Sequence, residues 1–431
     1  MKFLPYSFCV LFFFSGFDTP LSAQSITKLA QAEDQALLPE FNWLPYAFYT
    51  ESFGLGVGIG GAVSSWPAEE TTVLGDITLG TTGSYTIAAS ISQLRIPGTK
   101  RLYMTPFFMG RRYQDQILYN GSNNPGFEGE RAGSNDSSPD NFLLADQWDN
   151  QFEIMFSYLL PIGDGAGDEV VNTYIVEYGI LKKGATGGKS IHPMKSGRTS
   201  ILITPEWREQ TLKQQDQEVP LNTTNVSYGL EWDNRDYPSN PASGSYFLFE
   251  YQKDYQSDGA LSGWEAVAGE FEKIFDIGSS ENTRQRVIAV DFSTNFVLNW
   301  EEDAEGNPTR RPPQYEAATL GGLYRMRGYE DSRFHDRAAV YYSLEYRVIP
   351  VWQPLRKVEW LSFAQIQYWQ WILFAEAGRV SGQYDSELFY KDLHYDGGLS
   401  LRGMLHTSVL RLDVAISEEG SRVVAMYGHP F

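Results

Sequence analysis

The chain has 431 residues, of which 15% are aromatic, and a formal net charge of −20 at pH 7. Such an acidic protein lacks the basic surface that nucleic acid binding requires, so we exclude nucleic acid as a partner. No stretch reaches the roughly 18 apolar residues that a transmembrane helix needs.

The N-terminus has the pattern of a secretion signal. Lys2 supplies a positive charge, residues 8–14 ("FCVLFFF") an apolar core, and Leu21-Ser22-Ala23 the small residues before a cleavage site. We predict a signal peptide at residues 1–23, followed by a short periplasmic segment at 24–43. The alternative, a retained anchor, is disfavoured by the short apolar core. Cys9 is the only cysteine, and it lies in the predicted signal, so the mature chain is expected to have no disulfide and no cysteine-bound metal.

Alternation with a period of two residues begins after the predicted periplasmic segment. Residues 72–79 ("TVLGDITL") and 85–92 ("YTIAASIS") place successive side chains on opposite faces. Residues 340–348 ("VYYSLEYRV") and 410–416 ("LRLDVAI") do the same, with charges on one face only. This pattern is typical of a half-buried antiparallel sheet or of a membrane barrel with a polar lumen. The many aromatic residues favour the barrel, because Tyr and Trp are enriched at the headgroup level of a membrane.

Loops of unequal length separate the alternating segments. Residues 121–141 and 301–313 form long polar stretches, whereas residues 161–168 look like a short turn. Long loops on one side and short turns on the other are typical of a barrel in the bacterial outer membrane. We therefore predict an all-β transmembrane antiparallel barrel at residues 44–431. Sixteen strands would leave about 24 residues for each strand and its connection, although fourteen or eighteen fit almost as well by arithmetic.

Several motifs together resemble the barrel of the BamA/TamA superfamily, the bacterial surface antigen proteins. In chain order they are "PYAFYTESFGLGVGIG" at 45–60, "LEWDNRDYPSNPASGSY" at 230–246, "RMRGYED" at 325–331, "YYSLEYRVIP" at 341–350, "FAEAGRV" at 374–380, "YDGGLSLRG" at 395–403 and "LRLDVAIS" at 410–417. The terminal Phe431 is similar to the assembly signal of outer-membrane barrels, although Pro430 makes this ending atypical.

The resemblance implies that the sixth extracellular loop folds into the lumen. It identifies Arg327 as the loop arginine, with Glu345 and Glu376 as its partners on the barrel wall. Gly328 would allow the loop backbone to approach the wall closely, and Tyr329 would pack against it. Alternation supports Glu345, which lies on the charged face of its segment, but leaves Glu376 open because Phe374 shares its face. A purely structural role for the arginine and a role in a working cycle both remain open.

Two further sets of residues come from the same resemblance. Asp233, Arg235, Asp236 and Gly244 belong to a motif rich in turn residues, so we expect them to form hydrogen bonds at a strand end. Members of the family have a weakly joined first and last strand. We expect this seam near residues 53–63 and 421–431, with four candidate residues: Gly56, Gly58, Gly60 and Phe431.

No enzymatic site is predicted. The glycine-rich run at 54–61 is not followed by a βαβ unit, no nucleophile elbow is present, and the histidines have no metal-ligand spacing. We therefore predict no catalytic residue, no metal site and no cofactor.

The resemblance implies a factor that assembles or translocates proteins at the bacterial outer membrane. Its expected surroundings are outer-membrane lipid and lipopolysaccharide, and its expected partners are client proteins. Typical members carry periplasmic POTRA domains, but residues 24–43 are too few to form one, so a separate periplasmic subunit could supply that part. The alternatives are a passive pore or a lipid or solute transport barrel and, less favoured, a soluble secreted β-protein or enzyme.

Overall fold

The computed structural model describes residues 11–13, 27–30, 38–50, 52–167, 170–214, 217–256, 261–303, 308–354, 366–405 and 408–427. Within these ranges, no helix has both the length and the apolar character needed to cross a membrane.

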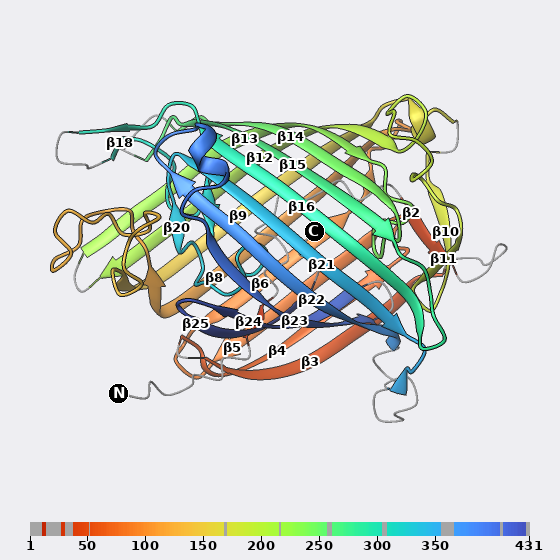
Figure 1. The fold of residues 1–431 in the computed structure, drawn as a ribbon, viewed down its shortest axis with the longest axis horizontal. Helices are drawn as coiled ribbons and strands as arrows, with labels where there is room; N and C mark the ends of the chain where they lie inside the picture. The colour runs from red at the N-terminus through yellow and green to blue at the C-terminus, as the bar shows by residue number, and fades with distance from the viewer. Residues whose placement is uncertain are drawn as a thin grey trace.

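The main sheet has 18 strands in the described part of the chain, of which β1 (Leu11–Phe13) and β7 (Leu94–Arg95) are short additions. The other sixteen strands form a barrel wall (Figure 1), which confirms the predicted fold and strand number. The wall strands are β3 (Glu40–Thr50), β4 (Gly54–Ser64), β5 (Thr72–Gly80), β6 (Tyr85–Ser92), β8 (Leu102–Leu118), β9 (Leu143–Leu159), β12 (Arg198–Gln214), β13 (Gln217–Asp233), β14 (Gly244–Asp254), β15 (Glu265–Asp276), β16 (Thr283–Val297), β21 (Ala338–Pro350), β22 (Ile366–Ser381), β23 (His394–Leu405), β24 (Ser408–Ser417) and β25 (Gly420–Tyr427).

Each wall strand pairs antiparallel with the next, from β3 at one end of the run to β25 at the other. The short β1 pairs in parallel with β25. The four alternating segments identified in the sequence all lie in wall strands, namely β5, β6, β21 and β24.

The wall has its polar side inward and its apolar side outward. On β21, Glu345 is fully buried whereas its neighbour Leu344 is 52% exposed. On β13, Thr223 and Asn225 are buried whereas Leu230 is 44% exposed. This is the reverse of a water-soluble sandwich, and it suits a barrel whose outer surface contacts lipid.

The first wall strand differs from the predicted one. The barrel begins at Glu40 with β3, four residues before the predicted boundary, so the glycine-rich segment is the second strand, β4. A Cβ atom on Gly56 would lie 2.5 Å from the ring of Phe48, and one on Gly58 would lie 2.4 Å from the ring of Tyr46. These glycines make room for aromatic side chains of β3, so Gly56, Gly58 and Gly60 do not lie on the first strand, where we expected the seam. Phe431 lies outside the described residues.

The connection between β9 and β12 is also longer than predicted. Residues 161–168, expected to be a short turn, open a connection at 160–197 that contains the 3-10 helix η1 (Gly163–Gly165) and the strands β10 (Asn172–Glu177) and β11 (Ile180–Lys183). These two strands form a small sheet with β2 (Thr27–Ala30) at one end of the barrel (Figure 1). Ile180 packs against a buried cluster that includes Tyr368 and Met404 on the wall. The hairpin of β10 and β11 is therefore packed against this end of the barrel.

Candidate functional site

The connection between β16 and β21, residues 298–337, is the sixth at its end of the barrel and is called loop 6 here. Its outer part holds β17 (Glu301–Glu302) and β18 (Pro308–Arg310), and its inner part begins and ends with β19 (Thr319–Leu320) and β20 (Phe334–His335). Between β19 and β20 the chain enters the lumen, where Met326 and Arg327 are fully buried. Gly321 and Gly322 adopt positive φ angles of 105° and 120° at the start of this inner segment, a conformation that glycine tolerates without strain.

Arg327 is surrounded by carboxylates from three strands. Its Nε donates to Glu376 Oε1 at 2.9 Å, and its Nη2 donates to Glu345 Oε1 at 3.1 Å. Its Nη1 lies 3.5 Å from Asp413 Oδ2. The side chains of these residues are at most 1% exposed. The structure therefore brings the predicted arginine and both predicted glutamates together and adds Asp413 on β24.

Phe374 shares the face of Glu376, and the structure shows why an apolar residue lies there. The guanidinium carbon of Arg327 lies 3.6 Å from the centroid of the Phe374 ring. The ring and the carboxylate thus contact the same cation, one through its π face and the other through its charge. Because both side chains face the lumen, the alternation of β22 holds at this point.

The loop backbone also binds the wall. The N–H of Arg327 donates to Glu376 Oε2 at 2.7 Å, and the N–H of Gly328 donates to Asp396 Oδ2 at 2.8 Å. Glu376 and Asp396 are register partners on β22 and β23. Two acids opposite each other on neighbouring strands repel, so the donors of loop 6 relieve an unfavourable pair in the wall.

Glu345 binds three arginines rather than one. In addition to Arg327, its carboxylate accepts from Arg347 Nε at 2.7 Å and from Arg402 Nη2 at 2.9 Å. Farther along the lumen, Arg411 on β24 lies 3.0 Å from Asp413 and donates to the carbonyl of Leu323 in loop 6. Arg327 is therefore one member of a network of alternating charges that extends from loop 6 through β21, β22, β23 and β24.

Gly328 has no space for a side chain. A Cβ atom there would lie 2.8 Å from Asp396 Cβ and 3.0 Å from Ser417 Cβ, and the Ser417 hydroxyl donates to the Gly328 carbonyl at 2.9 Å. We expect Gly328→Ala to lower the free energy of unfolding by about 1–3 kcal/mol, the usual cost of overpacking. Urea unfolding in detergent micelles, followed by tryptophan fluorescence, would measure this. Gly403→Ala is the matched control, because a Cβ atom on Gly403 would meet nothing within 4 Å. Equal stability of both variants would contradict the close approach.

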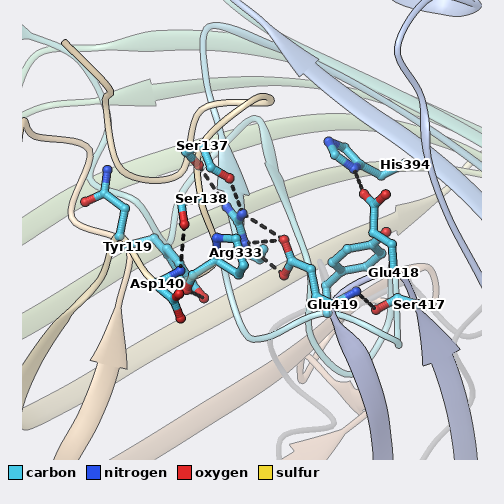
Figure 2. A network of polar contacts seen from close by, with 12 residues as sticks. Tyr119, Ser137, Ser138, Asp140, Arg333, His394, Ser417, Glu418 and Glu419 are labelled. Carbon is cyan, nitrogen blue, oxygen red and sulfur yellow. Dashed lines mark hydrogen bonds and ion pairs between the residues drawn. The ribbon is translucent and has the colours of Figure 1, made fainter. Parts of the chain in front are cut away.

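Tyr329 and the residues after it connect loop 6 to the last strands. The Tyr329 hydroxyl donates to the carbonyl of Tyr395 at 3.1 Å, and its own carbonyl accepts from Arg422 on β25. Arg333 binds Glu419, in the turn between β24 and β25, at 2.8 Å, and its Nη1 donates to Ser137 Oγ at 2.9 Å. Figure 2 shows Arg333 between these two partners, with His394 bound to Glu418 beside them. Loop 6 therefore joins the last hairpin to the 119–142 connection.

The contact of loop 6 with the 119–142 connection includes a buried histidine. The backbone N–H of His335 donates to the carbonyl of Gly133 at 2.8 Å. The ring Nε2 of His335 lies 3.0 Å from the carbonyl oxygen of Tyr119. Burial and the neighbouring guanidiniums of Arg131 and Arg311 lower the pKa of His335 well below its ordinary value of 6.5. A histidine with a lowered pKa stabilises the folded state above its ordinary pKa, and this contribution is lost as the pH falls below that value.

We therefore expect acidification from pH 7.5 to about pH 5 to loosen the contact between loop 6 and the 119–142 connection. Limited proteolysis should then cleave residues 120–141 faster at the lower pH. His335→Gln carries no titrating ring, so the difference in its cleavage rate between the two pH values should be smaller than in the wild type. An equal pH response in both proteins would show that His335 is not responsible.

The turn motif lies at the other end of the barrel, between β13 and β14. Arg235 Nε binds Asp233 at 3.0 Å, and its Nη1 reaches Glu272 on β15 at 3.1 Å. Asp236 accepts from the backbone N–H groups of Tyr237 and Ala242. Gly244 has a φ of 122°, and a Cβ atom there would lie 2.2 Å from the carbonyl oxygen of Asn234. The structure therefore places these four residues in the turn at the end of β13, where they form ion pairs and hydrogen bonds or allow the tight backbone. They lie far along the chain from Arg327 and outside its network.

The sequence motifs did not single out several members of the Arg327 network. These are Tyr341, Arg347, Asp396, Arg402, Arg411 and Asp413. A usable signal was present, since all six fall in the motif segments at 341–350, 395–403 and 410–417, where charges occupy a single face. Which of these charges meet depends on the pairing register of four strands, β21 to β24, and one strand alone does not reveal it.

Comparisons with known proteins agree with this architecture. The model of the Omp85 superfamily domain matches residues 168–423. The structure resembles BamA from Haemophilus ducreyi lacking POTRA domains 1-3, with 11% identity and a TM-score of 0.50 over 89% of this chain and 68% of that chain. It also resembles CdiB from Escherichia coli, with 8% identity and a TM-score of 0.55 over 91% of this chain and 62% of that chain. The chain thus spans about two thirds of the length of these two structures. Because the sequence identities are this low, the similarity establishes the fold alone. No curated protein matches the chain in sequence.

Proposed function

Since the chain belongs to the Omp85 superfamily, we propose that it inserts or translocates polypeptides at the outer membrane of a Gram-negative bacterium. The observation that supports this most is the position of Arg327, buried in the lumen between Glu345, Glu376 and Asp413. The same contacts hold loop 6 across the path that solutes would take through a passive pore, which favours this role over a pore.

The mechanism we propose uses a lateral seam between the first and last wall strands, β3 and β25. When this seam opens, the strand edges there would present N–H and C=O groups that an incoming strand can bind by β-augmentation, in the way that β1 pairs with residues 424–426 of β25. Loop 6 contacts β25 directly, because Arg422 binds the Tyr329 carbonyl and lies 3.4 Å from Glu330. Movement of loop 6 would therefore alter the support of β25, which links the Arg327 network to the seam.

The proposed surroundings follow from the outward-facing side chains. Apolar residues such as Leu344, Leu373 and Leu399 are more than half exposed on the outer face of β21, β22 and β23. They suit contact with outer-membrane lipid and lipopolysaccharide. Client polypeptides and a separate periplasmic subunit are the protein partners that this role would use.

Reconstitution into liposomes tests the proposal. A small unfolded outer-membrane barrel is added as the client, and its folding is followed by the shift of its band in unheated gel electrophoresis. We expect client folding to be several-fold faster with the protein than with empty liposomes, and Arg327→Ala to lose this acceleration. Liposomes that contain an unrelated outer-membrane barrel are the control. No acceleration by the wild type, together with steady ion conductance in a planar bilayer, would contradict the proposal and favour a passive pore.

A further inference from the structure

The hairpin of β10 and β11 lies at the end of the barrel opposite loop 6. Figure 1 shows β10 and β11 at one end of the barrel, and β18 and β20 of loop 6 at the other. The hairpin belongs to the connection between β9 and β12, so its chain leaves and re-enters the wall at these two strands. Where the base and the tip of the hairpin touch the wall shows whether it follows the rim or crosses the opening.

The base of the hairpin lies against the inner face of one side of the wall. Val170 is buried against Tyr103 on β8 and Leu159 on β9. The carbonyl of Val170 accepts from Arg198 Nη2, on β12, at 2.6 Å. These three wall residues belong to the buried, lumenal faces of their strands. The connection therefore starts inside the lumen, next to β8, β9 and β12.

The tip of the hairpin lies against the inner face of other strands. Tyr178 and Gly179 form a two-residue turn with φ angles of 53° and 82°, and Ile180 follows it. A Cβ atom on Gly179 would clash with the ring of Tyr368. Ile180 packs against four buried residues, one from each of β21, β22, β23 and β24, namely Ile349, Tyr368, Met404 and Val409.

The order of the strands shows that the base and the tip touch opposite sides of the wall. Counted along the sheet after β12, the strands β21 to β24 are the fifth to the eighth. Half of the circumference of a wall of sixteen strands is eight strands. The tip thus touches the wall almost opposite the strands from which the hairpin comes. The hairpin therefore crosses the lumen instead of following its rim.

The turn between β13 and β14 holds the hairpin in this position. Asn240 Nδ2 donates to the carbonyl of Gly179 at 2.8 Å, and its Oδ1 accepts from Gln370 Nε2, on β22, at 3.2 Å. Tyr237, in the same turn, contacts Tyr174 on β10 with the ring centroids 5.0 Å apart. The hairpin is therefore supported at its tip and in its middle as well as at its base.

The two faces of the hairpin differ in polarity. Tyr174 and Val176 are buried on one face of β10, in a cluster with Tyr237. The side chains of Glu177 and Lys182 are 60% and 51% exposed and lie 3.4 Å apart. A small sheet with one apolar, packed face and charged side chains in water suits a cover between the barrel interior and an aqueous space.

We propose that the β10–β11 hairpin is a second closure of the lumen, in series with loop 6. Loop 6 fills the lumen from one end, and the hairpin crosses it at the other. A solute or a polypeptide segment passes along the lumen only when both have moved. This inference rests on the geometry of the barrel and is independent of the proposed insertion of client polypeptides.

Ion conductance of the purified full chain in planar bilayers tests the arrangement in series. Gly179→Val should push the tip away from Tyr368, and Arg327→Met should loosen loop 6. Because the smaller of two conductances in series limits the current, each single variant should conduct almost as little as the wild type. The double variant should conduct several-fold more than the sum of the two. The gel shift of the unheated protein verifies that each variant is folded.

The matched control replaces Gly179→Val by Gly278→Val in the same double variant. Gly278 lies in the turn between β15 and β16 and has a φ of 80°, close to that of Gly179. A Cβ atom on Gly278 would meet no atom of the described chain within 4 Å. Gly278→Val with Arg327→Met should therefore conduct like Arg327→Met alone.

Labelling of a cysteine under the tip tests the position of the hairpin without the loop 6 variant. Met404 is 2% exposed and packs in the cluster that Ile180 contacts. In a chain with Met404→Cys and Cys9→Ser, a bulky water-soluble maleimide should react slowly. Gly179→Val should speed this reaction several-fold, whereas Gly278→Val should leave it unchanged.

Three outcomes would overturn the proposal. The first is a folded double variant, Gly179→Val with Arg327→Met, that conducts no more than its two single variants. The second is steady conductance of the wild type equal to that of the double variant. The third is equal labelling of Met404→Cys with and without Gly179→Val, which decides the matter even if the double variant does not fold. Neither measurement uses a client polypeptide, so a failure here is distinct from a failure of the insertion test.

Discussion

Replacement of Arg327 by methionine is expected to lower the free energy of unfolding by about 3–5 kcal/mol, the usual cost of breaking a buried ion pair from one side. The guanidinium contacts Glu345, Glu376 and Asp413 in a region with almost no exposure to water. Methionine fills much of the volume but leaves these carboxylates without their shared cation. The effect exceeds that of a lost contact, because the acids stay buried while the charge that offsets them is gone. Urea unfolding in detergent micelles would measure it.

Two variants separate this effect from a general loss of charge in loop 6. Arg310→Ala removes another arginine of loop 6, one that is 47% exposed and binds Glu301 at 3.3 Å. Surface pairs of this kind contribute about 0–1 kcal/mol, so this variant should unfold almost like the wild type. Arg327→Lys keeps the charge but loses the planar fork, and should lie between the two. If Arg327→Met and Arg310→Ala were equally stable, the lumenal network would contribute no more to the free energy of unfolding than a surface ion pair, which would contradict the prediction.

Replacement of Glu345 by glutamine is expected to be as damaging as the loss of Arg327. Its carboxylate lies between the guanidiniums of Arg327, Arg347 and Arg402, and all four side chains are at most 2% exposed. Glutamine has the same shape but no charge, so three cations would remain close together around a neutral group. We expect a loss of about 3–5 kcal/mol in the free energy of unfolding, with the same urea titration as the measurement.

The control for Glu345→Gln is the same substitution at Glu301, whose side chain is 57% exposed in loop 6. Its unfolding should match that of the wild type. A small effect at Glu345 would mean that other carboxylates stabilise the buried arginines without it. Glu376 and Asp413, and not Glu345, would then be the central acids of the network.

Local alternation and the family motifs were sufficient to predict the architecture. The polar face of "VYYSLEYRV" identified Glu345 as a lumenal residue, and "RMRGYED" identified Arg327 as its partner. Both predictions concern single strands or single loops, where the order of residues determines the face on which each lies. The structure brings these residues within bonding distance, as the resemblance implied.

Features that depend on pairing between strands were not predictable in the same way. Asp396 meets Gly328 only because β23 pairs with β22 in one register, and that register also places Asp396 beside Glu376. The glycines of β4 looked like a weak first strand, whereas they accommodate aromatic rings of β3. The hairpin of β10 and β11 was missed because the preceding turn residues at 161–168 suggested that the chain returned directly to the wall.

The central claim is that the guanidinium of Arg327 fixes loop 6 to the wall of the barrel. A double-mutant cycle of Arg327→Met and Glu376→Gln tests it most directly, since the Nε of Arg327 lies 2.9 Å from Glu376 Oε1. Free energies of unfolding of the wild type, both single variants and the double variant give the coupling energy between the two side chains. The structure predicts a coupling of about 1–3 kcal/mol, as found for residues in one network. Additivity within about 0.5 kcal/mol would show that the two groups do not interact, and would contradict the account.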